Sequence, residues 1–220
     1  MSTQTTDYLD IIERLPAGAK LELPDIAWEE YEQLLSRMED FPGHRLSYNR
    51  GRLVIVGPSA EHEDYKDFIY SLVRLISLET DVALETRGTT TFKSKKLLKG
   101  AEPDTCFYVQ SAPQIIGKRR INLDTDPPPD VVVEIDLSSG SLYKFPIYAA
   151  LRVPEIWRYD GHATRFYKLA GENYEVIQHS LAFPLLTAED LARYVELSKV
   201  KGQSVALRAF RQTLRPRATS

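Results

Sequence analysis

The sequence predicts a mixed α+β or α/β domain, in which a β-sheet is flanked by helices and followed by an additional C-terminal β-meander and helix. Three observations predict this fold class. Residues 61–79 carry one apolar stripe at helical spacing. Residues 130–137 form a nearly all-apolar run, typical of a central strand that is covered on both faces. Residues 156–178 contain a hairpin signal followed by a third strand.

The length of 220 residues fits one domain that can bury a sizeable core. With 43% hydrophobic and 27% charged residues, the composition is that of a globular protein. We expect an N-terminal segment at residues 1–24, the main domain at 25–198 and a basic tail at 199–220.

Local signals predict the elements of the first half in order. Asp25 is the candidate cap of a first helix that ends before Pro42. The Asn49-Arg50-Gly51 segment is typical of a short turn between two strands, and Pro58-Ser59 then starts the long helix. The segments that follow this helix and are rich in Thr, Val and aromatic residues predict two further strands, at residues 82–92 and 105–109.

The second half begins with a loop at residues 122–129, because its three consecutive prolines fit neither a helix nor an inner strand. After the strand at 130–137 we expect a short helix over 143–152. Pro146 is tolerated only in a first helical turn, so Lys144 should lie at or near the start of that helix. Thr187 is the candidate cap of a further helix, and the basic tail lacks a convincing apolar stripe.

Cys106 is the only cysteine, so the chain cannot form an internal disulfide, and we expect its thiol to be buried in a strand. The N-terminus has no basic head followed by an apolar core, as a secretion signal would. The longest apolar runs are far shorter than the roughly 18 residues of a membrane-spanning helix. We therefore expect a cytoplasmic protein that does not enter a membrane.

Acidic residues stand where strands should be apolar. Glu134 and Asp136 lie two residues apart on the central strand, so both project from the same face. Asp104 opens the strand that starts after Pro103. Because unpaired buried carboxylates cost several kcal/mol, these acids indicate a nearby cation. Three oxygen ligands on neighbouring strands suit a hard divalent ion such as Mg²⁺.

Each of these residues also has a structural interpretation. Asp104 and Asp136 could cap turns, and Glu134 could form a buried salt bridge, with Arg158 as a candidate partner. Lys144 could be an ordinary surface lysine near a helix start. None of the four histidines has the spacing of a zinc site.

The long helix offers two candidates for a site. Its angular pattern places Glu61 and His62 at opposite edges of the apolar stripe, while Glu63 points away from it. Glu61 is therefore the helical acid that we expect to reach a site. His62 is either a hydrogen-bonded core residue or a ligand or proton shuttle.

The ordered set of Pro103-Asp104, then Glu134 and Asp136, then Lys144 resembles the PD-(D/E)xK nuclease superfamily. More closely, Glu102-Pro103-Asp104 and the segments at 129–136 and 148–161 are similar to the Uma-type putative restriction endonuclease family. The resemblance covers roughly residues 25–194.

The resemblance implies a restriction-endonuclease-like mixed sheet and a Mg²⁺- or Mn²⁺-dependent endonuclease that acts on DNA. It implies that Asp104 and Glu134 bind the metal, with Asp136 as a third ligand or an outer acid. In the superfamily pattern a basic residue stands two positions after the glutamate, and here that position is Asp136. Lys144 on the next helix would take over its role.

The formal charge of −3 hides two basic stripes, of which the first lies between residues 86 and 101. Its candidates for phosphate contacts are Arg87, Lys93, Lys95 and Lys96. Cleavage of both strands of a duplex is simplest with two symmetric active sites, so we expect a homodimer. Two other classes remain open: a nucleic-acid-binding module of the same fold that lacks the chemistry, and a protein-interaction domain whose acids form structural salt bridges.

Overall fold

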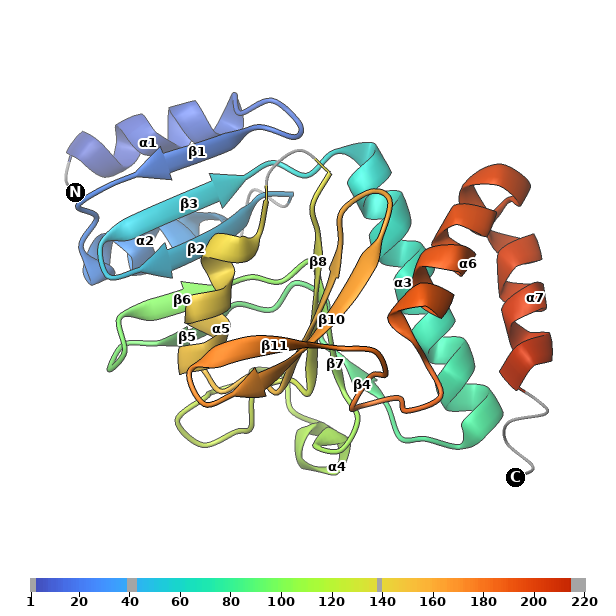
Figure 1. Cartoon of the computed structure of the whole chain (residues 1–220). Helices are drawn as coiled ribbons and strands as arrows, with labels where there is room; N and C mark the ends of the chain where they lie inside the picture. The colour runs from blue at the N-terminus through green and yellow to red at the C-terminus, as the bar shows by residue number, and fades with distance from the viewer. Residues whose placement is uncertain (1–2, 39–42, 138–139, 215–220) are drawn as a thin grey trace.

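The computed structural model describes residues 3–38, 43–137 and 140–214, and its strands form two β-sheets with helices packed around them (Figure 1). The first half contains α1 (Thr3–Glu13), β1 (Lys20–Leu23), α2 (Trp28–Met38), β2 (Arg45–Asn49), β3 (Arg52–Val56), α3 (Ala60–Thr80), β4 (Glu85–Thr86), β5 (Phe92–Ser94), β6 (Lys99–Ala101) and β7 (Thr105–Tyr108). The second half contains α4 (Ala112–Ile115), β8 (Val131–Ile135), the 3₁₀ turn η1 (Leu142–Lys144), α5 (Phe145–Ala150), β9 (Glu155–Tyr159), β10 (Thr164–Ala170), β11 (Asn173–Ile177), α6 (Ala188–Lys201) and α7 (Gln203–Leu214). No described helix is long and apolar enough to cross a membrane.

The first sheet is antiparallel, with strand order β1-β3-β2-β6-β5. Its central hairpin turns at Arg50 and Gly51, whose φ angles of 49° and 94° are both positive, as a two-residue type I′ turn requires. The turn predicted at this position is therefore confirmed. Helices α1 and α2 cover the sheet through a core that includes Ile12, Tyr31 and Leu53.

The second sheet has strand order β11-β10-β9-β8-β7-β4 and is mixed, because β8 and β9 run parallel while its other neighbours are antiparallel. The meander β9-β10-β11 continues the sheet of the motif strands. The meander predicted at these residues is therefore present, and it extends the sheet of the motif strands. Because β8 pairs in parallel with β9 after the α5 crossover, the motif strands and the meander form one continuous sheet.

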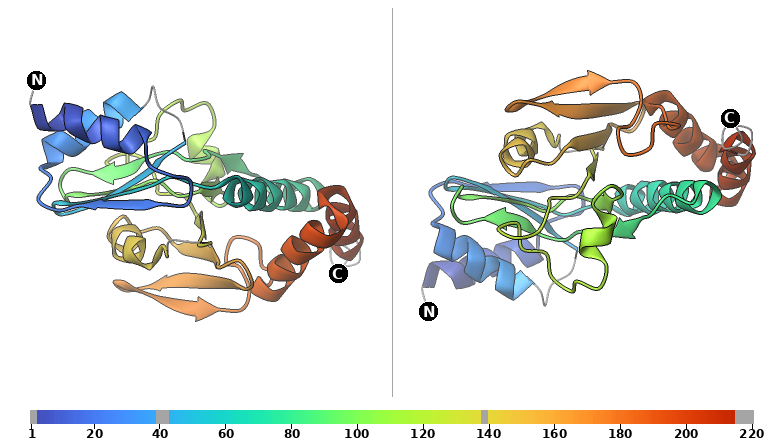
Figure 2. Two further views of the ribbon diagram at one scale, coloured as in Figure 1. Left: turned by 90° about the horizontal axis from the view of Figure 1, so that it is seen from above. Right: turned by 90° about the horizontal axis from the view of Figure 1, so that it is seen from below.

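The strand β8 is buried on both faces, as its apolar sequence predicts. Val131 and Val133 pack toward α3, α6 and α7, whereas Val132 packs toward α5. Figure 2 shows α6 and α7 lying beside α3 at one end of the molecule. Cys106 on β7 is buried on the α5 side, which confirms the interpretation of this thiol as a core residue.

The helix starts predicted at Ser59 and Thr187 are confirmed. The Ser59 hydroxyl accepts a hydrogen bond from the His62 N–H at 3.2 Å, and the Thr187 hydroxyl accepts one from the Asp190 N–H at 3.0 Å. Lys144 lies at the start of α5, and Pro146 stands in its first turn. These contacts are local in sequence, which is why the pattern predicts them.

Other local expectations are wrong. Asp25 has a φ of 57° and is not the cap of α2, which starts three residues later with Glu30 accepting a hydrogen bond from the Ala27 N–H at 2.9 Å. The predicted end of this helix, before Pro42, lies outside the described residues. The strand expected over 82–92 is split into β4 and the start of β5, because the chain turns at Gly88, where φ is 54°.

Several elements are not anticipated by the sequence pattern. These are the helices α1 and α4 and the strands β1 and β6. The two strands have four and three residues, and they pair with β3 and β2, which lie far away in the chain. Helix α7 lies within the segment described above as a basic tail, and it buries Ala206, Phe210 and Leu214 at four-residue spacing. It packs against α3 and α6, so the segment up to Leu214 is part of the folded body.

Candidate active site

Asp104 and Glu134 lie on adjacent strands at the same end of the second sheet. The register of β7 and β8 pairs Thr105 with Val133, and the Asp104 N–H donates to the Val133 carbonyl at 3.1 Å one step further. This contact places Asp104, the residue before β7, beside the end of β8 that carries Glu134, and both side chains line one cavity. Both carboxylates belong to the face of the sheet that α5 covers.

The Asp104 carboxylate is buried and hydrogen-bonded. Its Oδ2 accepts the Ile135 N–H at 2.7 Å and lies 3.0 Å from His62 Nε2. Burial by itself would raise the pKa of Asp104, but the hydrogen bond from His62 and the charge of Lys144 outweigh it and lower the pKa. The side chain is therefore an ionised carboxylate at neutral pH.

Glu134 pairs with Lys144 rather than with Arg158, so the partner expected for a salt bridge is wrong. Lys144 Nζ donates to Glu134 Oε2 at 2.7 Å and to the Glu102 carbonyl at 3.1 Å. The Tyr148 hydroxyl donates to the other carboxylate oxygen, Oε1. Tyr148 follows Lys144 by one helical turn on α5, which places both donors over the same acid.

Burial and the neighbouring charges act in opposite directions on the pKa values of this pair. It raises the pKa of Glu134 to about 8, against the opposing charge of Lys144. Burial would lower the pKa of Lys144, but the charges of Glu134, Tyr143 and Asp104 raise it. Lys144 therefore keeps its positive charge beside the two acids, and it is 4% exposed, so it is not an ordinary surface lysine.

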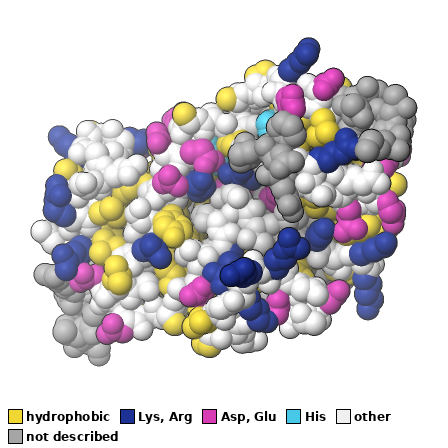
Figure 3. Space-filling view, turned by 180° about the vertical axis from the view of Figure 1, so that it is seen from behind, with side chains coloured by type: hydrophobic (Ala, Val, Ile, Leu, Met, Phe, Trp, Pro, Cys, Tyr) yellow, Lys and Arg dark blue, Asp and Glu magenta, His cyan; other side chains and the backbone are white. Residues whose placement is uncertain are grey.

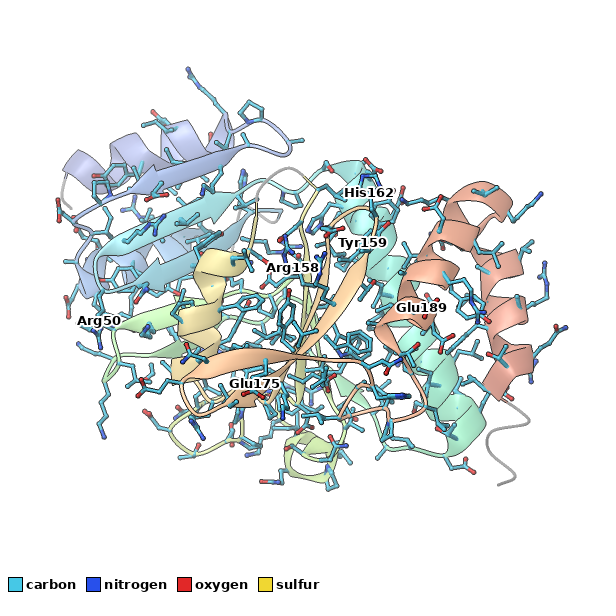
Figure 4. The ribbon with its side chains drawn as sticks, in the orientation of Figure 1. Arg50, Arg158, Tyr159, His162, Glu175 and Glu189 are labelled. Atoms are coloured by element: carbon cyan, nitrogen blue, oxygen red, sulfur yellow. The ribbon has the colours of Figure 1, made fainter. Side chains whose placement is uncertain are left out.

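Asp136 lies on the same face of the strand as Glu134, but it has a different partner. Its carboxylate accepts a hydrogen bond from Arg158 Nε, and its N–H donates to the Tyr159 carbonyl at 2.8 Å. Figure 4 shows Arg158 on β9, in the middle of the molecule. Within the described part of the chain, no three His, Cys, Asp or Glu side chains form a group that could hold a metal ion.

His62, and not Glu61, is the α3 residue that reaches the acids. The Glu61 carboxylate accepts a hydrogen bond from Tyr65 on its own helix, so the expectation that this acid reaches the site is wrong. Glu63 is also not directed away, because its Oε1 lies 3.2 Å from Arg45 and 3.3 Å from His62 Nδ1. His62 thus bridges Asp104 and Glu63, and its pKa is raised: burial opposes this shift, and the hydrogen bond to Asp104 outweighs burial.

A cavity of about 30 Å³ lies at these side chains. Its lining includes Asp104, Glu134, Asp136, Lys144 and His62. This volume holds one or two water-sized groups. Two adjacent carboxylates fit the oxygen-rich coordination of Mg²⁺ or Mn²⁺, which keep several waters and take one or two protein carboxylates together with phosphate oxygens.

The basic residues predicted for phosphate contacts are not in this cavity. Lys93 and Lys95 pair with Glu32 and Glu29 of α2, at 2.9 and 3.1 Å. Arg87 pairs with Glu85 at 2.8 Å. The assignment of these residues and of Lys96 to nucleic-acid binding stays a prediction.

Sequence reasoning missed Arg45 and Tyr148 as neighbours of the acids. Arg45 starts β2 of the other sheet, and the tertiary fold brings it to Glu63 at the start of α3. Tyr148 could have been found, because it lies four residues after Lys144 on the same short helix.

The structure is thus that of a mixed α+β protein with two sheets, in which Asp104 and Glu134 line one small cavity and Lys144 pairs with Glu134. The chain belongs to the Uma2 family, described as "Putative restriction endonuclease", whose family model matches residues 28–198. The family predicted from the motifs is thus confirmed. Among solved structures, the chain is similar to a putative nuclease belonging to DUF820 from Anabaena variabilis ATCC 29413, with 14% identity, a TM-score of 0.48, and coverage of 68% of this chain and 90% of that one. No curated protein matches the chain.

Proposed function

We propose that this member of the Uma2 family is a Mg²⁺- or Mn²⁺-dependent endonuclease that hydrolyses phosphodiester bonds of DNA. The observation that carries the proposal is the placement of Asp104 and Glu134 on adjacent strands, with the charged Lys144 Nζ 2.7 Å from Glu134. Asp104 and Glu134 are the metal ligands in this proposal. Asp136 acts as an outer acid that holds Arg158.

The chain's own residues supply orientation and charge. Lys144 is held by Glu134 and by the Glu102 carbonyl, so its ammonium is fixed where negative charge develops on the phosphate. His62 orients the Asp104 carboxylate, in the way that outer partners commonly fix metal ligands. A bound divalent ion would supply Lewis-acid stabilisation of the phosphate and a lower pKa for a water molecule.

A nucleic-acid-binding module without cleavage is the second candidate. The departure from the superfamily pattern favours it, because Asp136 replaces the usual basic residue and Lys144 is closed in by its salt bridge. In a third interpretation the two ion pairs, Glu134 with Lys144 and Asp136 with Arg158, are only structural. Metal binding separates the first two candidates from the third, and cleavage separates the first from the second.

The metal is tested by thermal unfolding with and without Mn²⁺, together with plasmid cleavage in the same buffer. We expect Mn²⁺ at 100 times its dissociation constant to stabilise the wild type by about 2.7 kcal/mol. Asp104→Asn keeps an oxygen that can accept the Ile135 hydrogen bond but lacks the charge, so both the stabilisation and the cleavage should disappear.

Asp67→Asn is the matched control, because Asp67 is an exposed acid on α3 and lies outside the cavity. This variant should respond to Mn²⁺ as the wild type does. Equal stabilisation of Asp104→Asn and the wild type would contradict metal binding at this site.

We also propose a homodimer, as the cleavage of both strands suggests. The described part of the sheet ends at β11, whose outer edge has no paired strand and whose Val176 is 65% exposed. Such an edge is a template for pairing with a second chain. Light scattering at high concentration should give twice the chain mass of 25.1 kDa. A monomer would make nicking of single strands the more natural activity.

A further inference from the structure

A second cavity, of about 520 Å³, lies between α2, the start of β2 and the loops around residues 89 and 120. We call it the basic groove and define it by its five cationic side chains: Arg45, Arg87, Lys93, Arg119 and Arg120. The lining contains one carboxylate, that of Glu102, so the formal charge of these groups is +4. A concave surface of one sign concentrates the field and attracts ligands of the opposite charge.

The Glu102 carboxylate is held by neutral donors, and it forms no ion pair within the described part of the chain. It accepts hydrogen bonds from the Leu46 N–H, at 2.8 Å, and from the Thr91 hydroxyl. Three of the five cations have an acidic partner just outside the lining: Arg45 with Glu63, Arg87 with Glu85 and Lys93 with Glu32. The uncompensated charge of the groove is therefore that of Arg119 and Arg120.

Two of the arginines are fixed and two are available. Arg87 donates to the Ile115 carbonyl at 2.7 Å and to Glu85 at 2.8 Å, and Arg45 pairs with Glu63. Arg119 and Arg120 are exposed, and neither forms an ion pair within the described ranges. A groove with two fixed and two exposed arginines suits a phosphate ligand, because a guanidinium group binds phosphate with two parallel hydrogen bonds.

The other wall of the groove is apolar. Leu35 and Met38 come from α2, and Leu46 and Ile121 complete this wall. A nucleotide has the same two-sided chemistry, with an apolar base and sugar on one side and an anionic phosphate on the other. The volume lies within the range of small-ligand pockets, about 300 to 1,000 Å³. The groove therefore accommodates a short strand and not the full width of a duplex.

The groove is adjacent to the candidate active site. Arg45 lines both cavities. The Glu102 side chain faces the groove, while its backbone carbonyl accepts the hydrogen bond from Lys144. Figure 2 shows α2 on the rear side of the molecule, and Figure 3 shows Lys and Arg side chains gathered across the middle of that rear face.

We infer that the basic groove binds a single-stranded segment of the nucleic-acid substrate next to the phosphodiester that is cleaved. Arg87, Arg119 and Arg120 neutralise its phosphates, and the apolar wall contacts its bases and sugars. This inference rests on the proposed function, because it places the strand relative to Asp104 and Glu134.

Binding without metal tests the groove separately from cleavage. The probe is a fluorescein-labelled oligodeoxythymidylate of about 12 nucleotides, measured by anisotropy in EDTA over a range of salt concentrations. The test variant is Arg119→Ala with Arg120→Ala. Each phosphate contact of a single strand contributes about 0.7 to the salt slope. The variant should therefore lose about 1.4 in slope and bind about 25-fold more weakly at 0.1 M salt.

The matched control is Arg165→Ala with Lys168→Ala, which removes two cations from β10, outside the groove. It should bind within about twofold of the wild type. Equal losses of affinity in the two variants, or no loss in either, would overturn the proposal that the basic groove binds the strand. So would equally tight binding of a duplex with the same dependence on Arg119 and Arg120.

The results also distinguish failure of the groove proposal from failure of the proposed nuclease activity. Loss of binding in the arginine variant, with no cleavage by the wild type, supports the groove and overturns the proposed activity. Cleavage by the wild type, with unchanged binding by the arginine variant, overturns the groove alone.

Discussion

Lys144→Ala is expected to reduce plasmid cleavage in Mn²⁺ by 100-fold or more. Lys144 Nζ is the cation held between Glu134 and the Glu102 carbonyl, and removal of one fixed charge stabiliser typically costs about that factor in rate. Metal binding needs the carboxylates and should persist. The rate and the Mn²⁺ affinity are measured on the same preparation.

Lys144→Arg provides a second comparison. Arginine keeps the charge but has a different shape, so we expect part of the cleavage to survive. The side chain is buried, so the larger guanidinium has to displace neighbours, and full activity is not expected. Lys118→Ala, which removes a lysine from the surface loop, should cleave as the wild type does. Equal cleavage by the wild type and Lys144→Ala would exclude the proposed role of this lysine. No cleavage by any of the proteins would favour the binding module.

Glu155→Ala is expected to cost about 4 kcal/mol of unfolding free energy. Glu155 is fully buried at the start of β9 and accepts hydrogen bonds from Trp157 Nε1 at 2.7 Å and from the N–H groups of Leu181 and Ala182 at 3.0 Å. The Ser180 hydroxyl is a fourth donor, at 3.2 Å. Each buried donor left without an acceptor costs about 1 to 3 kcal/mol. Urea denaturation monitored by circular dichroism measures the loss.

Glu175→Ala is the matched control, because Glu175 is an exposed acid on β11, at the front of the molecule in Figure 4. It should change the unfolding free energy by about 0.5 kcal/mol or less. A loss below about 1 kcal/mol in Glu155→Ala would contradict the role of Glu155 as the acceptor of these four hydrogen bonds.

Glu155 also predicts a dependence of stability on pH. Burial raises the pKa of Glu155 in the folded protein, against its hydrogen bonds, so its contribution to stability falls as the pH rises above the unfolded value near 4.5. Glu155→Gln should lose this part of the pH dependence.

Glu155 also clarifies the family motif. The segment from Val153 to Trp157 helped to indicate the family, and in the structure its acid ties β9 to the chain around Ser180. This glutamate therefore has a structural contact, whereas Glu134 faces the cavity. The resemblance assigned the metal to Glu134 and gave no role to Glu155, whose partners follow only from the tertiary contacts of β9.

The sequence by itself determined the local features of this protein. Helix α3, the turn at Arg50-Gly51 and the buried strand β8 follow from local patterns and turn chemistry, which act between residues near one another in the chain. The two-residue period of a strand placed Glu134 and Asp136 on one face, and the order of the motifs indicated the family.

Only the tertiary structure decided which groups meet. In the folded chain, Glu134 pairs with Lys144, Asp136 pairs with Arg158, and His62 contacts Asp104. The tertiary structure also merged the meander with the motif strands and gathered the basic groove from four separate segments. A local pattern fixes the face on which a side chain lies. Its partner is fixed by the packing of elements distant in sequence, because a buried charge is stable only where the whole fold supplies its counter-charge and hydrogen bonds.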